Sequence, residues 1–304
     1  MSQILDKQKA RLYGQLVMAA YQMYAKPGTD PLRPEPVGIP PGYELSAWIQ
    51  MSDFVLNAEE LKFYGIVVHE TANPDSRIVA IRGTEGLVEW LDDAAAIPVP
   101  FRQVPLAGRV ASGFDKIYST MKVVKRPLPM VAAAARPDAE QREAETFTGS
   151  FADQMEQLAI SRERERGERM PLTEGGTRIR RPTIVTGHSL GAALGTLFVM
   201  ENSSKGKFDI TTLCTFASPR VGNLEFVQTF NKLAIDSWRI VNMRDLVPKL
   251  PPKIPVVLDY DHVDTAFAFD SSVFAKTSLT CCHTLETYLH WLDSNAALTP
   301  SCVK

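Results

Sequence analysis

One pentapeptide has the residue types and spacing of a serine nucleophile. Residues 187–191 read Gly-His-Ser-Leu-Gly, a G-x-S-x-G pattern between an apolar segment (183–185) and a run of small residues that favours a helix. A sharp turn of this kind presents the serine hydroxyl at the carboxyl end of a strand. Such a turn tolerates only small residues two positions to either side, which explains both glycines. The following helix starts at the serine, and its free N–H groups favour negative charge there. The pattern predicts nucleophilic chemistry at Ser189.

A serine hydroxyl is a weak nucleophile and needs a base, which in turn needs a group to orient it. In strand–turn–helix hydrolases the acid and then the histidine follow the serine along the chain. Asp245 comes just after the apolar segment 238–241, where a triad acid would be presented, and a proline-rich loop follows it. The other acids in this part of the chain look like loop or turn charges. Three histidines follow the serine and are candidate bases: His262, His283 and His290.

Alternating elements in the C-terminal half would position these residues. Strands alternating with helices are typical of βαβ units on a parallel sheet, so the sequence predicts an α/β fold. Two further strands are expected upstream, on either side of an Asn-Pro-Asp-Ser turn, and an amphipathic helix opens the chain. The expected helices are 4–25, 189–201 and 223–234, and the expected strands are 63–70, 77–81, 183–185, 211–216 and 238–241.

The segment 125–180 interrupts this alternation. It contains an alanine run at 131–135, a charged run at 162–169 with four arginines and three glutamates, and two glycines at 175–176. Opposite charges that nearly cancel are typical of a solvated helix or a surface excursion. The alternative is an insertion that caps a binding site.

Composition describes an ordinary globular protein. The chain has 304 residues, 45% of them apolar and 22% charged, and a formal charge of -2. Near-neutral charge gives no electrostatic case for a nucleic-acid partner, and the composition excludes collagen, coiled-coil and fully disordered classes. No apolar run approaches the roughly 20 residues that span a membrane, and no standard secretory signal is present. We therefore expect a cytoplasmic protein, or one exported without such a signal.

The four cysteines give no metal or redox motif. They contain no C-x-x-C pair, which removes the zinc-ribbon and thioredoxin interpretations. A bridge from Cys281 or Cys282 to Cys302 is one alternative, but we expect buried free thiols at all four positions, Cys214 included.

Five segments of the chain form a recognisable pattern. They are Val79–Thr84 followed by Trp90 and Asp93, Gly187–Gly191, Thr215–Asn223 (Thr-Phe-Ala-Ser-Pro-Arg-Val-Gly-Asn), Arg244–Pro252 (Arg-Asp-Leu-Val-Pro-Lys-Leu-Pro-Pro) and Cys282–Leu289 (Cys-His-Thr-Leu-Glu-Thr-Tyr-Leu). Together they resemble the class 3 lipase family, which includes fungal triacylglycerol lipases and plant phospholipase A1-type enzymes, all α/β-hydrolases. Val79–Thr84 is similar to the family's Phe-Arg-Gly-Thr segment. The resemblance runs in order from about residue 62 to 292 and is absent from about 125 to 180.

The resemblance implies a role for each candidate residue. It makes Ser189 the nucleophile, His283 the general base and then acid, and Asp245 the orienting carboxylate. It leaves His262 as a structural residue, and His290 fits a C-terminal helix as a surface or packing residue. The oxyanion hole would use the Leu190 N–H and Thr84, with Asp93 fixing the Thr84 hydroxyl. This mechanism needs neither a metal nor an organic cofactor.

Two stretches bear on the substrate pocket. The family usually has Val-His-x-Gly-Phe where this chain has Val-Ala-Ser-Gly-Phe (110–114), which puts the pocket wall in doubt but not the triad. Residues 86–105 match the place of the family's lid, and their mixture of apolar and acidic residues suits a flap with one apolar face. A packed helix and loop would have a similar composition.

The resemblance implies a function. Residues 1–304 are expected to form a single α/β-hydrolase domain that hydrolyses acylglycerols or other fatty-acyl esters through an acyl-enzyme intermediate. Phospholipid sn-1 esters and short-chain or aryl esters stay open, as does a peptidase or thioesterase on the same fold. A non-catalytic interaction protein would usually lack a triad member, and here all three are present. The expected partners are the ester or lipid substrate and transient contact with a lipid interface.

Overall fold

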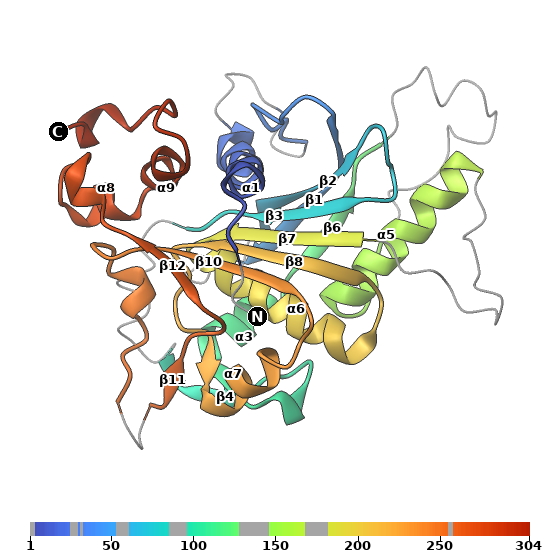
Figure 1. The fold of residues 1–304 in the computed structure, drawn as a ribbon. Coiled ribbons are helices and arrows are strands. Elements are labelled where there is room, and N and C mark those ends of the chain that lie inside the picture. Colours follow the sequence, from blue (N-terminus) through green and yellow to red (C-terminus); the bar gives the residue numbers. More distant parts are fainter. Residues whose placement is uncertain are drawn as a thin grey trace.

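The computed structural model describes residues 4–24, 30, 33–52, 61–84, 96–127, 146–167, 182–254 and 258–304. Within them, the main sheet has the strand order β12-β10-β8-β7-β3-β2-β1-β6 (Figure 1). The strands from β12 to β3 are parallel to one another, and β2, β1 and β6 continue the sheet as antiparallel neighbours. A smaller antiparallel sheet has the order β11-β9-β5-β4.

The elements have the following bounds. The main-sheet strands are β1 Tyr43–Ser52, β2 Leu61–Glu70, β3 Arg77–Ile81, β6 Lys122–Lys125, β7 Pro182–His188, β8 Asp209–Phe216, β10 Asp236–Asn242 and β12 Ala266–Phe269. The small-sheet strands are β4 Pro98–Pro100, β5 Arg109–Ala111, β9 Gly222–Asn223 and β11 Tyr260–Asp261. The α-helices are α1 Lys7–Tyr21, α3 Ser112–Tyr118, α5 Phe151–Arg166, α6 Leu190–Lys205, α7 Leu224–Phe230, α8 Leu279–His283 and α9 Leu285–Leu292. Short 3₁₀ helices are η1 Gln22–Tyr24, η4 Pro105–Ala107, η6 Val247–Lys249, η7 Ser271–Val273 and η8 Pro300–Cys302.

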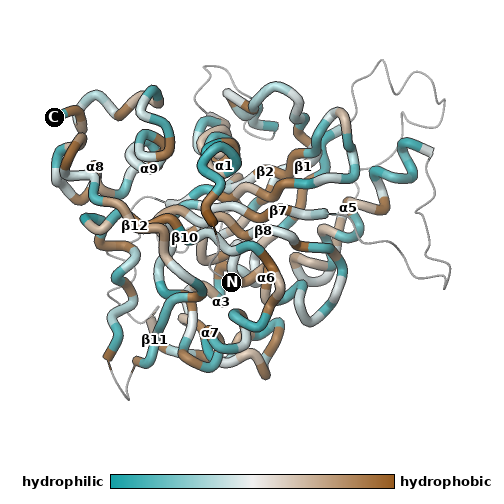
Figure 2. The backbone as a smooth tube through the Cα atoms, in the orientation of Figure 1, coloured by the Kyte–Doolittle hydropathy of each residue, from teal (hydrophilic) through white to brown (hydrophobic). Residues whose placement is uncertain are grey.

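Helices cover both faces of the main sheet. Along β3, Ile78 and Ala80 face the cluster that includes α1 and α9, while Val79 and Ile81 face the one that includes α3, α5 and α6. Figure 1 accordingly shows α1 and α9 on one side of the sheet and α3 and α6 on the other. A strand buried on both faces is continuously apolar rather than alternating, and Figure 2 shows hydrophobic residues concentrated along the central strands.

This arrangement confirms the predicted fold class. The expected strands at 63–70, 77–81, 183–185, 211–216 and 238–241 correspond to β2, β3, β7, β8 and β10. The helix predicted at 189–201 runs on to Lys205, and the one predicted at 223–234 ends at Phe230. The sequence analysis missed β1, because its residues on both faces are buried and no clear alternation marks it.

Part of the segment 125–180 belongs to the main core. Helix α5 begins with a capping box, in which Ser150 and Asp153 exchange hydrogen bonds with each other's backbone N–H groups. Its apolar residues, Phe151, Met155 and Leu158 among them, join the cluster on the α6 side of the sheet. Residues 128–145 and 168–181 lie outside the described residues, so the expected cap stays a prediction.

The expected lid region is also only partly described. Asp93 and Trp90 lie outside the described residues. Within its described part, residues 96–105, β4 pairs with β5 in the small sheet and Phe101 is fully buried in the core.

The prediction of four free thiols is wrong for one pair. Cys281 and Cys302 form a disulfide across a separation of 21 residues. Backbone contacts bring the C-terminal residues back to this place, since the Lys276 N–H donates to the Cys302 carbonyl (3.0 Å) and Ala275 pairs with Val303. Cys214 and Cys282 are buried free thiols, as expected. None of the helices that the structure describes is both long enough and apolar enough to span a bilayer.

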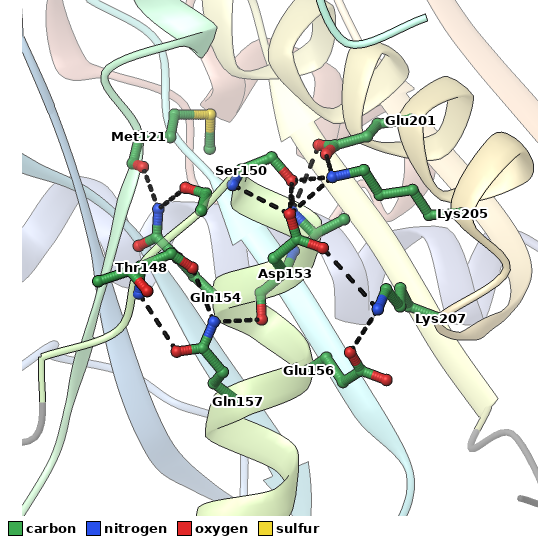
Figure 3. A network of polar contacts seen from close by, with 12 residues as sticks. Met121, Thr148, Ser150, Asp153, Gln154, Glu156, Gln157, Glu201, Lys205 and Lys207 are labelled. Atoms are coloured by element: carbon green, nitrogen blue, oxygen red, sulfur yellow. Dashed lines mark hydrogen bonds and ion pairs between the residues drawn. The ribbon is translucent and has the colours of Figure 1, made fainter.

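A network of polar contacts holds α5 against α6, the helix that follows Ser189 (Figure 3). Glu201 on α6 is fully buried and accepts hydrogen bonds from the Tyr118 hydroxyl (2.5 Å) and the Ala152 N–H (3.3 Å). Lys205 lies 3.0 Å from the same carboxylate and 2.7 Å from Asp153. The buried charge is therefore paired and hydrogen-bonded, which is the condition for its being tolerated.

We expect Glu201→Ala to lower the free energy of unfolding by about 2–4 kcal/mol, because it leaves a buried hydroxyl and a buried N–H without an acceptor. Urea denaturation at pH 7 measures this loss. The control is Glu156→Gln in the same network, where the ion pair with Lys207 (2.6 Å) is partly exposed and should be worth less than about 1 kcal/mol. Equal losses for the two variants would contradict the account.

Candidate active site

Ser189 occupies a strained turn between β7 and α6. Its backbone has φ 58° and ψ −125°, a region that residues with a side chain rarely adopt and that costs on the order of 1–3 kcal/mol. The neighbouring glycines have no room for a side chain. A Cβ at Gly187 would lie 2.4 Å from the Gly191 carbonyl oxygen, and a Cβ at Gly191 would lie 2.2 Å from the Ile81 carbonyl oxygen. The two glycines thus let β7, β3 and α6 meet at the serine.

The structure brings Ser189, His283 and Asp245 together. The Ser189 Oγ lies 2.9 Å from His283 Nε2, and His283 Nδ1 lies 2.8 Å from Asp245 Oδ2. The three residues come from the start of α6, the end of α8 and the loop after β10. Of the three histidines that the residue pattern left open, the geometry selects His283. His262 instead contacts the Pro248 carbonyl and His290 the Ala296 carbonyl.

Asp245 is almost completely buried, and hydrogen-bond donors compensate its charge. Its Oδ1 accepts the Val247 N–H (3.0 Å), and its Oδ2 accepts the Tyr288 hydroxyl (2.7 Å) in addition to His283. Burial, and then the nearby Asp245 carboxylate, raise the pKa of Tyr288 well above its usual value, so the phenol keeps its proton. The carboxylate is therefore fixed in one orientation towards the histidine.

Asn242, the last residue of β10, joins the acid's strand to the histidine's helix. Its side-chain N–H donates to the Cys282 carbonyl (2.8 Å) and to the Ser271 hydroxyl (2.9 Å). Its side-chain oxygen accepts the backbone N–H groups of Arg244 and Ser271, both at 3.2 Å. Because Asn242 is fully buried and uses both ends of its amide, it fixes the loop that carries Asp245 relative to the helix that carries His283.

Of the two expected oxyanion donors, Leu190 follows Ser189 directly and Thr84 belongs to a segment that packs on it. Leu190 is the first residue of α6, where backbone N–H groups have no acceptor within the helix. Thr84 ends the short segment 82–84 after β3, and its hydroxyl lies 3.5 Å from that of Tyr64. At the preceding Gly83 a Cβ would lie 2.8 Å from the Ser189 Cβ, so this segment packs directly on the serine.

The loop that follows Asp245 is held by contacts to its carbonyl groups. Arg220 donates to the Pro251 carbonyl (2.8 Å) and to that of Lys249, and His262 contacts the Pro248 carbonyl at 2.7 Å. Burial, and then the nearby Arg239 guanidinium, lower the pKa of His262 to about 3. The imidazole is therefore neutral at ordinary pH, and the nitrogen that faces the carbonyl must carry its proton.

The sequence analysis assigned no role in the site to four residues that the structure places there: Tyr21, His188, Asn242 and Tyr288. The Tyr288 hydroxyl contacts Asp245, and His188 contacts the backbone of His283, its Nε2 lying 2.8 Å from the His283 carbonyl oxygen. The partners are far apart in sequence, so no local pattern marks them. The described residues contain no group of side chains that could hold a metal ion.

We expect His262→Gln to make stability less sensitive to acid. Between about pH 6.5 and 3 the unfolded chain binds a proton on His262 that the native state refuses, so native stability falls as the pH falls. Removing this group should flatten that slope by up to about 1.4 kcal/mol per pH unit, while glutamine keeps a donor near the Pro248 carbonyl. Urea denaturation at several pH values from 7 to 4 compares the two slopes. Identical slopes in wild type and variant would show that His262 is not the group responsible.

The sequence matches a known protein family and several known proteins. The family model described as "Lipase (class 3)" matches residues 78–254. Phospholipase A1-Igamma2, chloroplastic, of Arabidopsis thaliana is 37% identical over 134 residues, which are 36% of this chain and 25% of the plant protein. Phospholipase A1-Ialpha2, chloroplastic, of the same plant is 27% identical over 243 residues, 71% of this chain and 44% of the relative. The chain thus spans less than half the length of these relatives.

Solved structures share the fold. A lipase from Rhizopus microsporus var. chinensis has a TM-score of 0.54 at 20% identity, covering 88% of this chain and 76% of that one. A mutant of the Penicillium cyclopium protein MDLA has a TM-score of 0.55 at 19% identity, covering 91% and 85%. A triacylglycerol lipase whose catalytic centre is a serine protease triad has a TM-score of 0.55 at 18% identity, covering 90% of this chain and 84% of that one. The fold is that of these lipases, the α/β-hydrolase fold.

Proposed function

Because the chain belongs to the class 3 lipase family, we propose that it hydrolyses carboxylic esters of fatty-acyl lipids with Ser189 as the nucleophile. The observation that supports the proposal most is the contact geometry of three residues: Ser189 Oγ lies 2.9 Å from His283 Nε2, and His283 Nδ1 lies 2.8 Å from Asp245 Oδ2. A proton can pass from the serine to the histidine along this line while the aspartate holds the ring.

Each residue has a defined step. His283 Nε2 takes the Ser189 proton as Oγ attacks the ester carbonyl, and Asp245 stabilises the imidazolium that forms. The tetrahedral intermediate collapses to an acyl-enzyme when His283 gives the proton to the leaving alcohol. His283 then takes a proton from water, the hydroxide attacks the acyl group, and the returning proton releases Ser189 and the fatty acid.

The oxyanion needs donors that are already in place. We assign this role to the Leu190 N–H and to Thr84, and we assign Asp93 to fixing the Thr84 hydroxyl. A preorganised donor of this kind contributes on the order of 3–4 kcal/mol to lowering the barrier. The close packing of segment 82–84 on Ser189 supports the assignment, because it leaves these donors little freedom to move.

The substrate class is a finer proposal. We place acylglycerols or related fatty-acyl esters first. A phospholipase A1 activity is the second candidate, favoured by the names of the plant relatives, which are phospholipase A1 enzymes and a galactolipase. The same chemistry at Ser189 serves both. Transient contact with a lipid interface belongs to either activity.

The arrangement of the whole chain is also a proposal. We propose a single α/β-hydrolase domain over 1–304, with residues 86–105 as the lid region and 125–180 as an insertion or cap. Since β4 and Phe101 are part of the small sheet and the core, a moving flap would use the lid region before Pro98. Since α5 is part of the core, a cap would use the parts of 125–180 outside Phe151–Arg166. Deleting only such parts should then change acyl-chain preference more than thermal stability.

We expect Ser189→Ala to lower kcat/KM on p-nitrophenyl esters by at least about 10⁴-fold, because the attacking oxygen is removed. Ester lengths from C2 to C16 are compared at one pH. Ser203→Ala is the matched control, since it removes an exposed hydroxyl from the C-terminal part of the same helix, and it should keep wild-type activity.

Further measurements distinguish an enzyme that uses Ser189 from one that does not and from a protein without activity. If soluble esters are not hydrolysed, emulsified triolein and phospholipid vesicles follow, with the released fatty acid and lysophospholipid measured by mass spectrometry. Turnover that survives Ser189→Ala would remove Ser189 as the nucleophile. No turnover on any of these substrates would favour a lipase-like interaction protein.

A further inference from the structure

A buried chain of hydrogen bonds connects the N-terminal helix to both sides of the site. Tyr21 is the last residue of α1, and its hydroxyl accepts the Gly83 N–H at 2.8 Å. The same hydroxyl lies 2.8 Å from Nδ1 of His188, and Nε2 of His188 lies 2.8 Å from the His283 carbonyl oxygen. This series of hydrogen bonds thus runs from Gly83, the neighbour of Thr84, to the backbone of His283.

The direction of each hydrogen bond follows from the chemistry of its atoms. A carbonyl oxygen only accepts, so Nε2 of His188 must carry a proton. Burial, and then the charge of His283, hold the pKa of His188 well below its usual value, so the ring is neutral and Nδ1 accepts. Tyr21 therefore donates to Nδ1 and accepts from Gly83, and burial raises its pKa so that it stays protonated. Each of these three hydrogen bonds therefore has one donor and one acceptor.

The two ends of this chain lie on either side of the reacting serine. At Gly83 a Cβ would lie 2.7 Å from the Tyr21 hydroxyl and 3.1 Å from the His188 carbonyl oxygen, so segment 82–84 is wedged between α1 and the nucleophile turn. At the other end, the rings of His188 and His283 have centroids 4.7 Å apart. A shift of Tyr21 would therefore disturb the oxyanion segment and the base together.

We infer that Tyr21 is a positioning residue for catalysis: its hydroxyl, acting through His188, fixes the position of segment 82–84 relative to His283. The inference rests on the proposed roles of Ser189, His283 and Thr84. It also makes α1 part of the catalytic apparatus, although this helix precedes the region 78–254 that the family model matches. A displacement on the order of 1 Å in such a site costs about 100-fold in rate.

Tyr21→Phe tests the inference by removing a single oxygen atom. The ring, with its edge contact to His188 and its place beneath Arg82, can stay where it is. The Gly83 N–H and His188 Nδ1 lose their partner. We expect kcat on a p-nitrophenyl ester to fall about 10- to 100-fold while KM changes less than about 3-fold, because substrate binding is not touched. An unchanged kcat would overturn the inference.

The matched control is Tyr13→Phe. Tyr13 lies on the same helix, is buried in the core, and stacks on Trp238 with the ring centroids 6.2 Å apart. It should leave kcat and KM unchanged even if it lowers the melting temperature. A parallel fall of kcat in both variants would mean that the helix acts only through stability, which would contradict the positioning role.

A double-mutant cycle separates one connected chain from two independent effects. His188→Asn keeps a polar atom near Tyr21 but is too short to reach the His283 carbonyl. If the chain acts as a unit, the double variant loses kcat to within about 3-fold of the worse single variant. Multiplication of the two single losses would overturn the inference, and His188→Asn with wild-type kcat would do so even if Tyr21→Phe failed to fold. An inactive wild type would instead overturn the proposed function and this inference with it.

Discussion

The close approach of three backbone segments at Ser189 is the constraint on which the rest of the structure depends. The serine has a positive φ, and neither Gly187 nor Gly191 has space for a Cβ. Such a turn persists only where its surroundings determine it completely. Here β3 and β8 flank β7 in the sheet, and the Ser189 N–H donates to the Phe216 carbonyl at 2.9 Å. The parallel strands β3, β7 and β8, together with the start of α6, thus hold the Ser189 turn in place.

Burial of polar groups around that hydroxyl imposes a second requirement, which is that each group has a partner. Asp245 has three donors, Asn242 uses both ends of its amide, and His188 is neutral with both ring nitrogens engaged. In a low-dielectric interior these hydrogen bonds are strong, and an unpaired member would be costly. The same contacts that make the buried groups tolerable also restrict how the triad can move.

The sequence predicted the residues that meet at the site better than the framework around them. The pentapeptide at 187–191 singled out Ser189, the chain order limited the candidate acids and bases, and the family resemblance selected His283, which the fold places in contact with Ser189 and Asp245. The strands that follow residue 181 were found because each is short, apolar and separated by a helix. Strand β1 and the bridge from Cys281 to Cys302 were not, since their signals depend on partners elsewhere in the fold. Tyr21 lies 167 residues from His188, so only the folded chain could reveal their contact.

The central claim is that Ser189 is a nucleophile activated by His283. Labelling with a fluorophosphonate, followed by peptide mass spectrometry, tests it most directly because it needs no knowledge of the natural substrate. We predict one label per chain, on the peptide that contains Ser189, at a rate that falls by at least about 10²-fold in His283→Ala because general-base help is lost. Label on another residue, or equal rates in wild type and variant, would contradict the account.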